Sequence, residues 1–283
     1  MPFSTLALLV LAGALHAGWN LVLKRTEARL VVAWASLVMG ALVSLPAFFL
    51  FPPLTARAVA CAALSALLEG LYFTLLTRAY GRGDFSVVYP VARGAAPALL
   101  AFWAVAFLGE RPTPLGWLGL GVLIAGLVWV GRSGTGGSGT GVSAASVGLA
   151  LAVSVTISLY SAVDAVAVRQ AHPIPYTALV FLLSAGTIGA ALLLGPDRAQ
   201  LGKTFARSWR PAALVGVLSL ATYVMVLAAY SRGSVAYAGA VREVSIVFGA
   251  LAGWLWLKES FGPARLAGSL LIFLGALLIA LGG

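Results

Sequence analysis

The feature that most limits the possible folds of this chain is a series of ten apolar stretches, each about 20 residues long. A bilayer core needs about 20 apolar residues for one spanning helix, so each stretch is long enough to cross a membrane. The stretches lie at residues 3–23, 30–50, 58–78, 85–108, 114–131, 147–168, 175–194, 211–230, 234–257 and 263–281. Charged residues are only 9% of the chain, against about 25% in a soluble domain. The sequence therefore predicts an all-α, multi-pass integral membrane protein with ten transmembrane helices.

A segment rich in Gly, Ser and Thr divides these stretches into two groups of five. Its composition, RSGTGGSGTGVSAAS at residues 132–146, is typical of a flexible linker that carries no chemistry of its own. We therefore expect a first five-helix repeat at residues 1–131, a linker at 132–146 and a second five-helix repeat at 147–283.

The two halves repeat each other in sequence. AYGRG at residues 79–83 matches AYSRG at 229–233, and HAGWN at 16–20 aligns more weakly with YSAVD at 160–164. Further landmarks recur in order at an offset of 149: Arg93 with Arg242, Glu110 with Glu259, Pro114 with Pro263, Gly119 with Gly268, and Gly126 with Gly275. Because five is an odd number, the second half must enter the membrane from the opposite face. This predicts two inverted repeats, a construction typical of secondary transporters.

The glycines of the last helix in each half are spaced seven residues apart, so each pair lies on one helix face. Small residues allow membrane helices to approach closely, and we expect these two helices to be packing helices.

At this point the chain resembles the drug/metabolite transporter superfamily, and within it the EamA-like ten-helix exporters. The resemblance rests on LGERPTPLGWLGLGVLIAGLVWVG at residues 108–131 and LKESFGPARLAGSLLIFLGALLIALG at 257–282. A shorter match, LHAGWNLVLKR at 15–25, resembles a subgroup associated with phosphonate utilisation. The superfamily implies export or exchange of small metabolites, often amino acids and usually proton-linked, and does not fix the substrate.

Two arginines inside predicted spans are the main site candidates. Arg93 and Arg242 each lie about eight residues into a helix, about 12 Å from its end, which places both near the middle of the membrane. Pro90 and Pro97 remove backbone donors around Arg93, so we expect broken backbone lining a cavity there. The functional interpretation is recognition of a carboxylate, phosphate or phosphonate by the guanidinium groups, with Tyr89 beside them.

The structural interpretation of the same arginines is that Glu69, Glu243 or Asp164 neutralises each one and locks helices together. Glu69, eleven residues into its span, is either a proton carrier or the counter-ion of an arginine. Asp164 lies close to a helix end, and we expect it to be a water-exposed carboxylate near Arg169.

Three residues of the first span share one helix face: His16, Trp19 and Asn20, at positions i, i+3 and i+4. A titratable ring, an aromatic wall and an amide together suit a cavity, and His16 is a second candidate for proton coupling. The alternative is that His16 makes an ordinary hydrogen bond between helices.

Other functional classes lack the residues they need. The sequence has no P-loop, HExxH or GxSxG motif, and its single cysteine, Cys61, allows no intrachain disulfide and no CxxC metal site. The net charge of +10 is spread over short loops rather than concentrated in a basic run, which argues against nucleic-acid binding. We expect no cofactor and no metal.

The prediction that combines these observations is a secondary active transporter of the cytoplasmic membrane, exporting a small metabolite by alternating access, as a monomer or homodimer. One alternative is a lipid flippase on the same fold, and a remote one is a membrane-embedded enzyme or assembly factor.

Orientation is a testable prediction on which two arguments disagree. Without Arg93 and Arg242, sixteen basic residues remain, and twelve of them follow helices 1, 3, 5, 7 and 9 while four lie on the other face. Basic residues in short loops stay cytoplasmic, so the count places both termini outside, whereas the resemblance implies termini inside. No basic residue precedes the first span to hold the N-terminus inside. We expect alkaline phosphatase activity from a fusion to Gly283, and fluorescence from a cytoplasm-only reporter there would contradict the count.

The larger group comprises Lys24, Arg25, Arg29, Arg78, Arg82, Arg132, Arg198, Lys203, Arg207, Arg210, Lys258 and Arg265, and the smaller group comprises Arg57, Arg111, Arg169 and Arg232.

Overall fold

The computed structural model describes residues 3–108, 113–133, 143–195, 198, 201–232, 235–259 and 262–282, and its regular structure within these ranges is helical. Most of the expected linker and Glu110 lie outside the described residues. The helices are α1 (Phe3–Arg25), α2 (Arg29–Ser44), α3 (Ala47–Leu50), α4 (Ala56–Arg82), α5 (Phe85–Leu108), α6 (Pro114–Arg132), α7 (Ala144–Ala167), α8 (Pro173–Leu194), α9 (Leu201–Tyr230), α10 (Val235–Arg242), α11 (Val244–Leu255) and α12 (Gly262–Gly282).

These helices coincide with the predicted spans, with three differences. The second span is divided into α2 and α3 near Pro46, and the ninth is divided into α10 and α11. The eighth span begins ten residues earlier than predicted, because α9 starts at Leu201 and continues through Pro211. In the described part of the chain, seven helical spans are long and apolar enough to cross a membrane: α1, α2 with α3, α4, α7, α8, α9 and α12.

The outer surface is apolar, as a surface in contact with lipid must be. Phe49 is 90% exposed and Leu194 is 88% exposed, and large apolar side chains are exposed along most of the helices. A water-soluble protein rarely exposes apolar patches of this extent. The interior is also mainly hydrophobic, but it holds serines, threonines and several charged residues among the apolar side chains.

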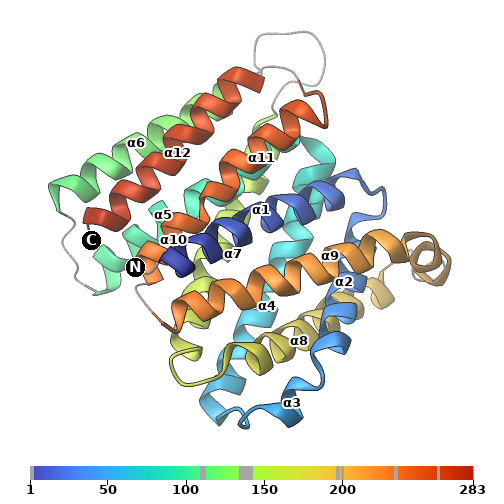
Figure 1. The fold of residues 1–283 in the computed structure, drawn as a ribbon. Helices are drawn as coiled ribbons and strands as arrows, with labels where there is room; N and C mark the ends of the chain where they lie inside the picture. Colours follow the sequence, from blue (N-terminus) through green and yellow to red (C-terminus); the bar gives the residue numbers. More distant parts are fainter. Residues whose placement is uncertain are drawn as a thin grey trace.

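Helices of the two halves pack against one another rather than forming two separate bundles (Figure 1). Late helices of the first half pack on early helices of the second: α4 packs on α7 and α8, and α5 packs on α7. Late helices of the second half pack in the same way on early helices of the first: α9 packs on α1 and α2, and α10 and α11 pack on α1. The start of α1 and the end of α12 lie at the same end of the bundle (Figure 1).

The pair α6 and α12 packs through glycines, as the spacing predicted. A Cβ atom added at Gly119 would lie 2.6 Å from the backbone nitrogen of Ile279, and one added at Gly126 would lie 2.7 Å from that of Ile272. The partner's residue number falls as the glycine's number rises, so the two helices run antiparallel (Figure 1). Backbone contact this close requires glycine.

The expected break in the backbone around Arg93 is wrong. Helix α5 continues through Pro90 and Pro97 without interruption. The hydroxyl of Ser154 in α7 donates to the carbonyl oxygens of Ala92 at 2.7 Å and Val91 at 3.0 Å, which fastens α7 to this stretch of α5. The interruption lies in the equivalent helix of the second half, where α10 ends at Arg242 and α11 begins at Val244.

The glycine contacts give a prediction with a control in the same helix. Gly119→Ala should destabilise the protein by about 1–3 kcal/mol, because its methyl group has no room against α12. Gly121→Ala should not destabilise it, because nothing lies within 4 Å of an added Cβ there. Thermal unfolding of both variants in detergent measures the difference. Equal unfolding temperatures for the two variants would contradict the packing.

Candidate functional site

A pocket lies inside the bundle, lined by side chains from α1, α4, α7, α8, α9 and α10 and therefore by both halves of the chain. Its polar lining includes His16, Glu69, Asp164 and Arg242, each of which is at most 8% exposed. Buried ionisable side chains are costly within a membrane and are usually retained for function. The pocket is therefore the candidate site.

The cationic part of the site is an ion-pair triad formed across the two halves. Arg93 of α5 donates from Nη2 to Glu243 Oε1 at 2.8 Å, and Arg242 Nη2 approaches the same oxygen at 3.4 Å. Two guanidinium groups thus share one carboxylate, which leaves one positive charge in excess. Within the described residues, Glu243 is the acid paired with either arginine.

The break between α10 and α11 positions this triad. Glu243 lies between the two helices, and Arg242 is the last residue of α10. Gly13 lets α1 approach closely, because a Cβ there would lie 2.9 Å from Val244 Cγ1 and 3.4 Å from the carbonyl oxygen of Arg242. Discontinuous helices of this kind place charged and backbone groups in the middle of a membrane.

The acidic part of the site consists of Glu69 from α4 and Asp164 from α7. Glu69 is 3% exposed and accepts a hydrogen bond from the hydroxyl of Ser184 at 3.2 Å. Asp164 accepts hydrogen bonds from the hydroxyls of Tyr176 at 2.7 Å and Tyr223 at 2.6 Å. Hydroxyl groups are thus the partners of both carboxylates, and neither is among the acids paired with an arginine in the described residues.

The expectation that Asp164 is water-exposed is wrong, since it is 1% exposed and lines the pocket. Proximity to a helix end was a misleading signal, because α8 and α9 cover the end of α7 with Tyr176 and Tyr223. The repeat alignment held the better signal: it matched Asp164 with Asn20, which accepts a hydrogen bond from Tyr80 at 2.6 Å. Each half therefore joins the first helix to the third through a tyrosine.

The face of α1 that carries His16, Trp19 and Asn20 does not act as one unit. The rings of His16 and Trp19 are 4.9 Å apart and both line the pocket. Nitrogen Nε2 of His16 and Nε1 of Trp19 have no hydrogen-bond partner among the described residues. Asn20 instead donates to the carbonyl oxygen of His16 at 2.9 Å and accepts from Tyr80, so both ends of its amide are occupied within the protein.

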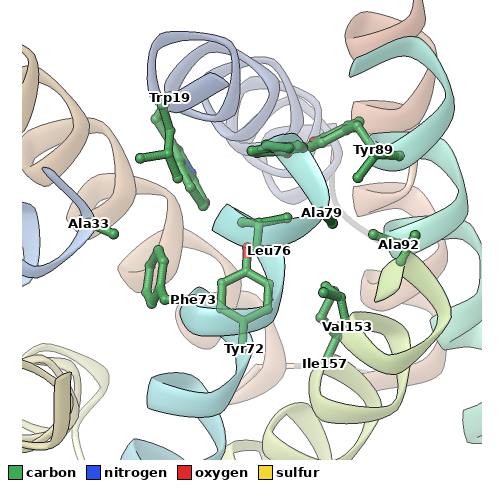
Figure 2. Packing of buried hydrophobic residues seen from close by; sticks show 14 of the residues in the cluster. Trp19, Ala33, Tyr72, Phe73, Leu76, Ala79, Tyr89, Ala92, Val153 and Ile157 are labelled. Atoms are coloured by element: carbon green, nitrogen blue, oxygen red, sulfur yellow. The ribbon is translucent and has the colours of Figure 1, made fainter. Parts of the chain in front are cut away.

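An aromatic wall continues from Trp19 along α4. The ring of Phe73 is 6.0 Å from that of Trp19, and Tyr72 is 4.9 Å from Phe73 (Figure 2). Tyr89 lies on α5 (Figure 2), and its ring is 6.2 Å from that of His16. It lies outside the lining of the pocket, and Gly249 gives it space.

The structure therefore brings together four of the predicted site residues: His16, Trp19, Glu69 and Arg242 line one pocket. The other three, Asn20, Tyr89 and Arg93, are buried behind its lining.

Sequence reasoning also missed Arg265, which was counted with the loops. It is 1% exposed, and its Nη2 lies 2.9 Å from Asp84 Oδ2. Without Arg265, the membrane face reached after helices 1, 3, 5, 7 and 9 still holds more basic residues than the other face. Its position three residues after Gly262, inside α12, was the available signal.

Metal binding has no support from the described residues, among which no three His, Cys, Asp or Glu side chains are grouped to hold an ion.

Comparison with known proteins gives relatives of the same kind. The chain is 26% identical over 187 residues to the pseudopaline exporter CntI of Pseudomonas aeruginosa, in both strain UCBPP-PA14 and strain PAO1. The match covers 65% of this chain and 62% of the exporter, so it spans less than two thirds of that relative's length. A protein of known crystal structure shares the fold with a TM-score of 0.67 and 18% identity, over 98% of this chain and 96% of that one.

The model of the EamA-like transporter family matches residues 3–132 and residues 144–281, which together make up nearly all of the chain. Members of this family are embedded in membranes and are transporters rather than enzymes. The buried charges inside a helical bundle with an apolar surface agree with that assignment. The chain belongs to the EamA-like transporter family.

Proposed function

We propose that this protein is a secondary active exporter of a small metabolite carrying an anionic group, and that it works by alternating access between two inverted five-helix repeats. The observation that carries the proposal is the excess positive charge of the Arg93–Glu243–Arg242 triad, presented to the pocket by Arg242. An anionic group bound there neutralises a charge that no further ion pair compensates within the described residues.

Four observations support the inverted repeat. Equivalent helices α6 and α12 run antiparallel, as they must when one half is inverted relative to the other. The packing of α4 on α7 and α8 has its counterpart in the packing of α9 on α1 and α2, so each half contacts the other in the same way. The start of α1 and the end of α12 lie together, which requires an even number of crossings (Figure 1). The family model also matches each half separately.

The donors around the pocket suit an anionic group. Within the part of the chain that the structure describes, Nε of Arg242, Nε2 of His16, Nε1 of Trp19 and the hydroxyl of Ser161 are buried without a hydrogen-bond partner. Buried polar groups that lack partners are rare in folded proteins, and each one costs stability. A bound carboxylate or phosphate supplies acceptors for such groups.

Arg93 acts on the substrate through Glu243 rather than by contact. Its 2.8 Å ion pair holds the carboxylate on the side away from the pocket, which weakens the neutralisation of Arg242 at 3.4 Å. The three residues thus set the charge of the site together.

Glu69 and His16 are the proposed proton-coupling residues. The sequence allowed Glu69 to be either a proton carrier or the counter-ion of an arginine. Glu243 is the counter-ion of both Arg93 and Arg242, which favours the proton carrier for Glu69. Glu69 is buried, bonds to a hydroxyl and is outside the ion pairs of the described residues, so it can exchange a proton with the pocket without breaking an ion pair. His16 lies on the facing helix with a free ring nitrogen.

Export is the proposed direction because the curated relatives are exporters of pseudopaline. The substrate of the present chain is proposed only by its chemistry, a small solute with a carboxylate, phosphate or phosphonate group. The alternative of a lipid flippase predicts movement of phospholipid between leaflets, which a fluorescent-lipid assay on the same vesicles measures.

The anion site predicts a selective loss of transport. Efflux of amino acids, dicarboxylates, phosphate esters and alkylphosphonates is measured from proteoliposomes, each solute beside its neutral amide or ester. Arg242→Gln should reduce efflux of the transported anion by about 10- to 100-fold, because a hydrogen bond to a charged group contributes about 1.5–3 kcal/mol. The neutral analogue should be a poor substrate for the native protein.

The control for this prediction is Arg232→Gln, which removes an exposed arginine beyond the end of α9. It should leave efflux unchanged. Arg93→Gln should reduce efflux while the protein remains folded in the membrane. Full transport of the anion by Arg242→Gln would eliminate the anion site, and unfolding of Arg93→Gln would support the purely structural interpretation of the triad.

A further inference from the structure

The end of the bundle at which α1, α4 and α11 finish and α5 and α12 begin is held together by polar contacts that the proposed anion site does not use. We call it the latch end. Arg265 of α12 reaches Asp84 Oδ2 at 2.9 Å and donates from Nη1 to the hydroxyl of Ser86 at 2.6 Å. Glu259 accepts hydrogen bonds from the backbone nitrogens of Phe85 at 2.7 Å and Ser86 at 2.8 Å. Every one of these contacts joins the first half to the second.

Glu259 is the N-terminal cap of α5 although it belongs to the other half. Its carboxylate occupies the free N–H groups at the start of that helix, where the helix dipole also favours a negative charge. The turn before it is unusual, because Lys258 has a φ of 54°, a left-handed conformation that non-glycine residues seldom adopt. The nitrogen of Glu259 then bonds back to the carbonyl oxygen of Gly253 at 3.1 Å. Backbone strain of this kind collects at functional positions.

Two basic residues at the end of α1 strengthen the closure. Lys24 Nζ donates to the carbonyl oxygens of Tyr80 at 2.8 Å and Gly83 at 2.6 Å. Arg25 Nη2 donates to the carbonyl oxygen of Trp256 at 3.2 Å, which is a further contact between the two halves. Arg265 is only 1% exposed, so its contacts with Asp84 and Ser86 lie inside the protein.

The pocket extends away from this end. Its lining includes Tyr230, the last residue of α9, and Asp164, three residues before the end of α7, and both helices finish at the opposite end of the bundle. Toward the latch end, the lining of α1 stops at Trp19, and the hydrogen bond between Asn20 and Tyr80 lies between it and Lys24. The conformation is therefore closed at the latch end.

The repeat makes the latch one-sided. The offset of 149 that aligns Pro114 with Pro263 places Gly116 opposite Arg265, and glycine has no side chain with which to form the same ion pair at the other end. The ion pair of Arg265 is thus available at one end of the transporter and not at the equivalent position of the other.

We propose that Asp84, Ser86, Glu259 and Arg265 form a gating latch that closes one end of the transporter and that must open in each transport cycle. This inference rests on the proposed alternating access. Arg265 and Glu259 act as positioning residues for the start of α5, the helix that carries Arg93. Opening the latch separates Arg265 from Asp84 and releases the N-terminus of α5 from Glu259.

The test measures access to the pocket without any substrate. Cys61→Ser removes the single native cysteine, and Ser161→Cys places a reporter in the pocket lining. A membrane-impermeant thiol reagent is applied from each side of the membrane in turn. Lys203→Cys, exposed at the start of α9, identifies the side of the latch end.

Arg265→Gln and Asp84→Asn should each speed labelling of the reporter from the latch end by about tenfold and slow it from the opposite end, because they shift the population between two conformations. The double variant should label no faster than the faster single variant, since both remove the same ion pair. The control Arg82→Gln, an exposed arginine at the end of α4, should leave both rates unchanged.

Three results would overturn the latch: unchanged labelling in Arg265→Gln and Asp84→Asn, additive effects in the double variant, or faster labelling from both sides at once, which indicates local loosening. If Arg265→Gln does not fold, Asp84→Asn and Glu259→Gln carry the test, because each removes one partner and keeps Arg265. The reporter needs no transported solute, so failure of the latch is distinguishable from failure of the proposed function.

Discussion

Two arginines share one glutamate in the interior of a bundle whose outer surface faces lipid, and most of the architecture serves to hold this triad. Removing one partner from a buried ion pair leaves an uncompensated charge at a cost of about 3–5 kcal/mol. The protein meets this requirement only when the halves are assembled, because Arg93 belongs to the first and Arg242 and Glu243 to the second. Gly13 and the interruption between α10 and α11 bring the backbone close enough for the contact. Folding, assembly of the halves and formation of the site are thus coupled through one carboxylate.

Charge imbalance gives the site its chemistry. The triad carries one positive charge in excess, whereas Glu69 and Asp164 are held by hydroxyl groups on the other side of the same pocket. A solute that binds between them meets a cationic donor set at one side and carboxyl groups at the other. At the latch end, Arg265 is paired with Asp84 across the joint, and Glu259 bonds to backbone N–H groups of the other half. Contacts that break and re-form in a cycle are best made between groups that water can solvate when they separate, which suits Asp84, with 24% of its side chain exposed.

Much of the fold was predictable from the sequence, because hydropathy and length determine membrane helices almost alone. The repeat landmarks also identified Arg93 with Arg242 and the glycines that pack α6 on α12. What the sequence does not reveal is which neighbour satisfies each polar group. Proline positions indicated a break near Arg93, yet α5 continues through both prolines, and Ser154 of another helix bonds to its backbone at Ala92. Asp164 looked exposed by its place near a helix end, and tyrosines from α8 and α9 bury it. Arg265 looked like a loop residue, and its partners lie about 180 positions earlier in the chain.

The central claim is that a proton gradient drives an anionic metabolite through this pocket by way of Glu69 or His16. The most direct measurement is flux of the transported anion in proteoliposomes, with and without an imposed pH gradient, for the native protein, Glu69→Gln and His16→Ala. The account predicts that the gradient accelerates flux by the native protein, and that at least one of the two variants loses this acceleration while retaining exchange of solute across the membrane. Gradient-driven flux that is unchanged in both variants would contradict it.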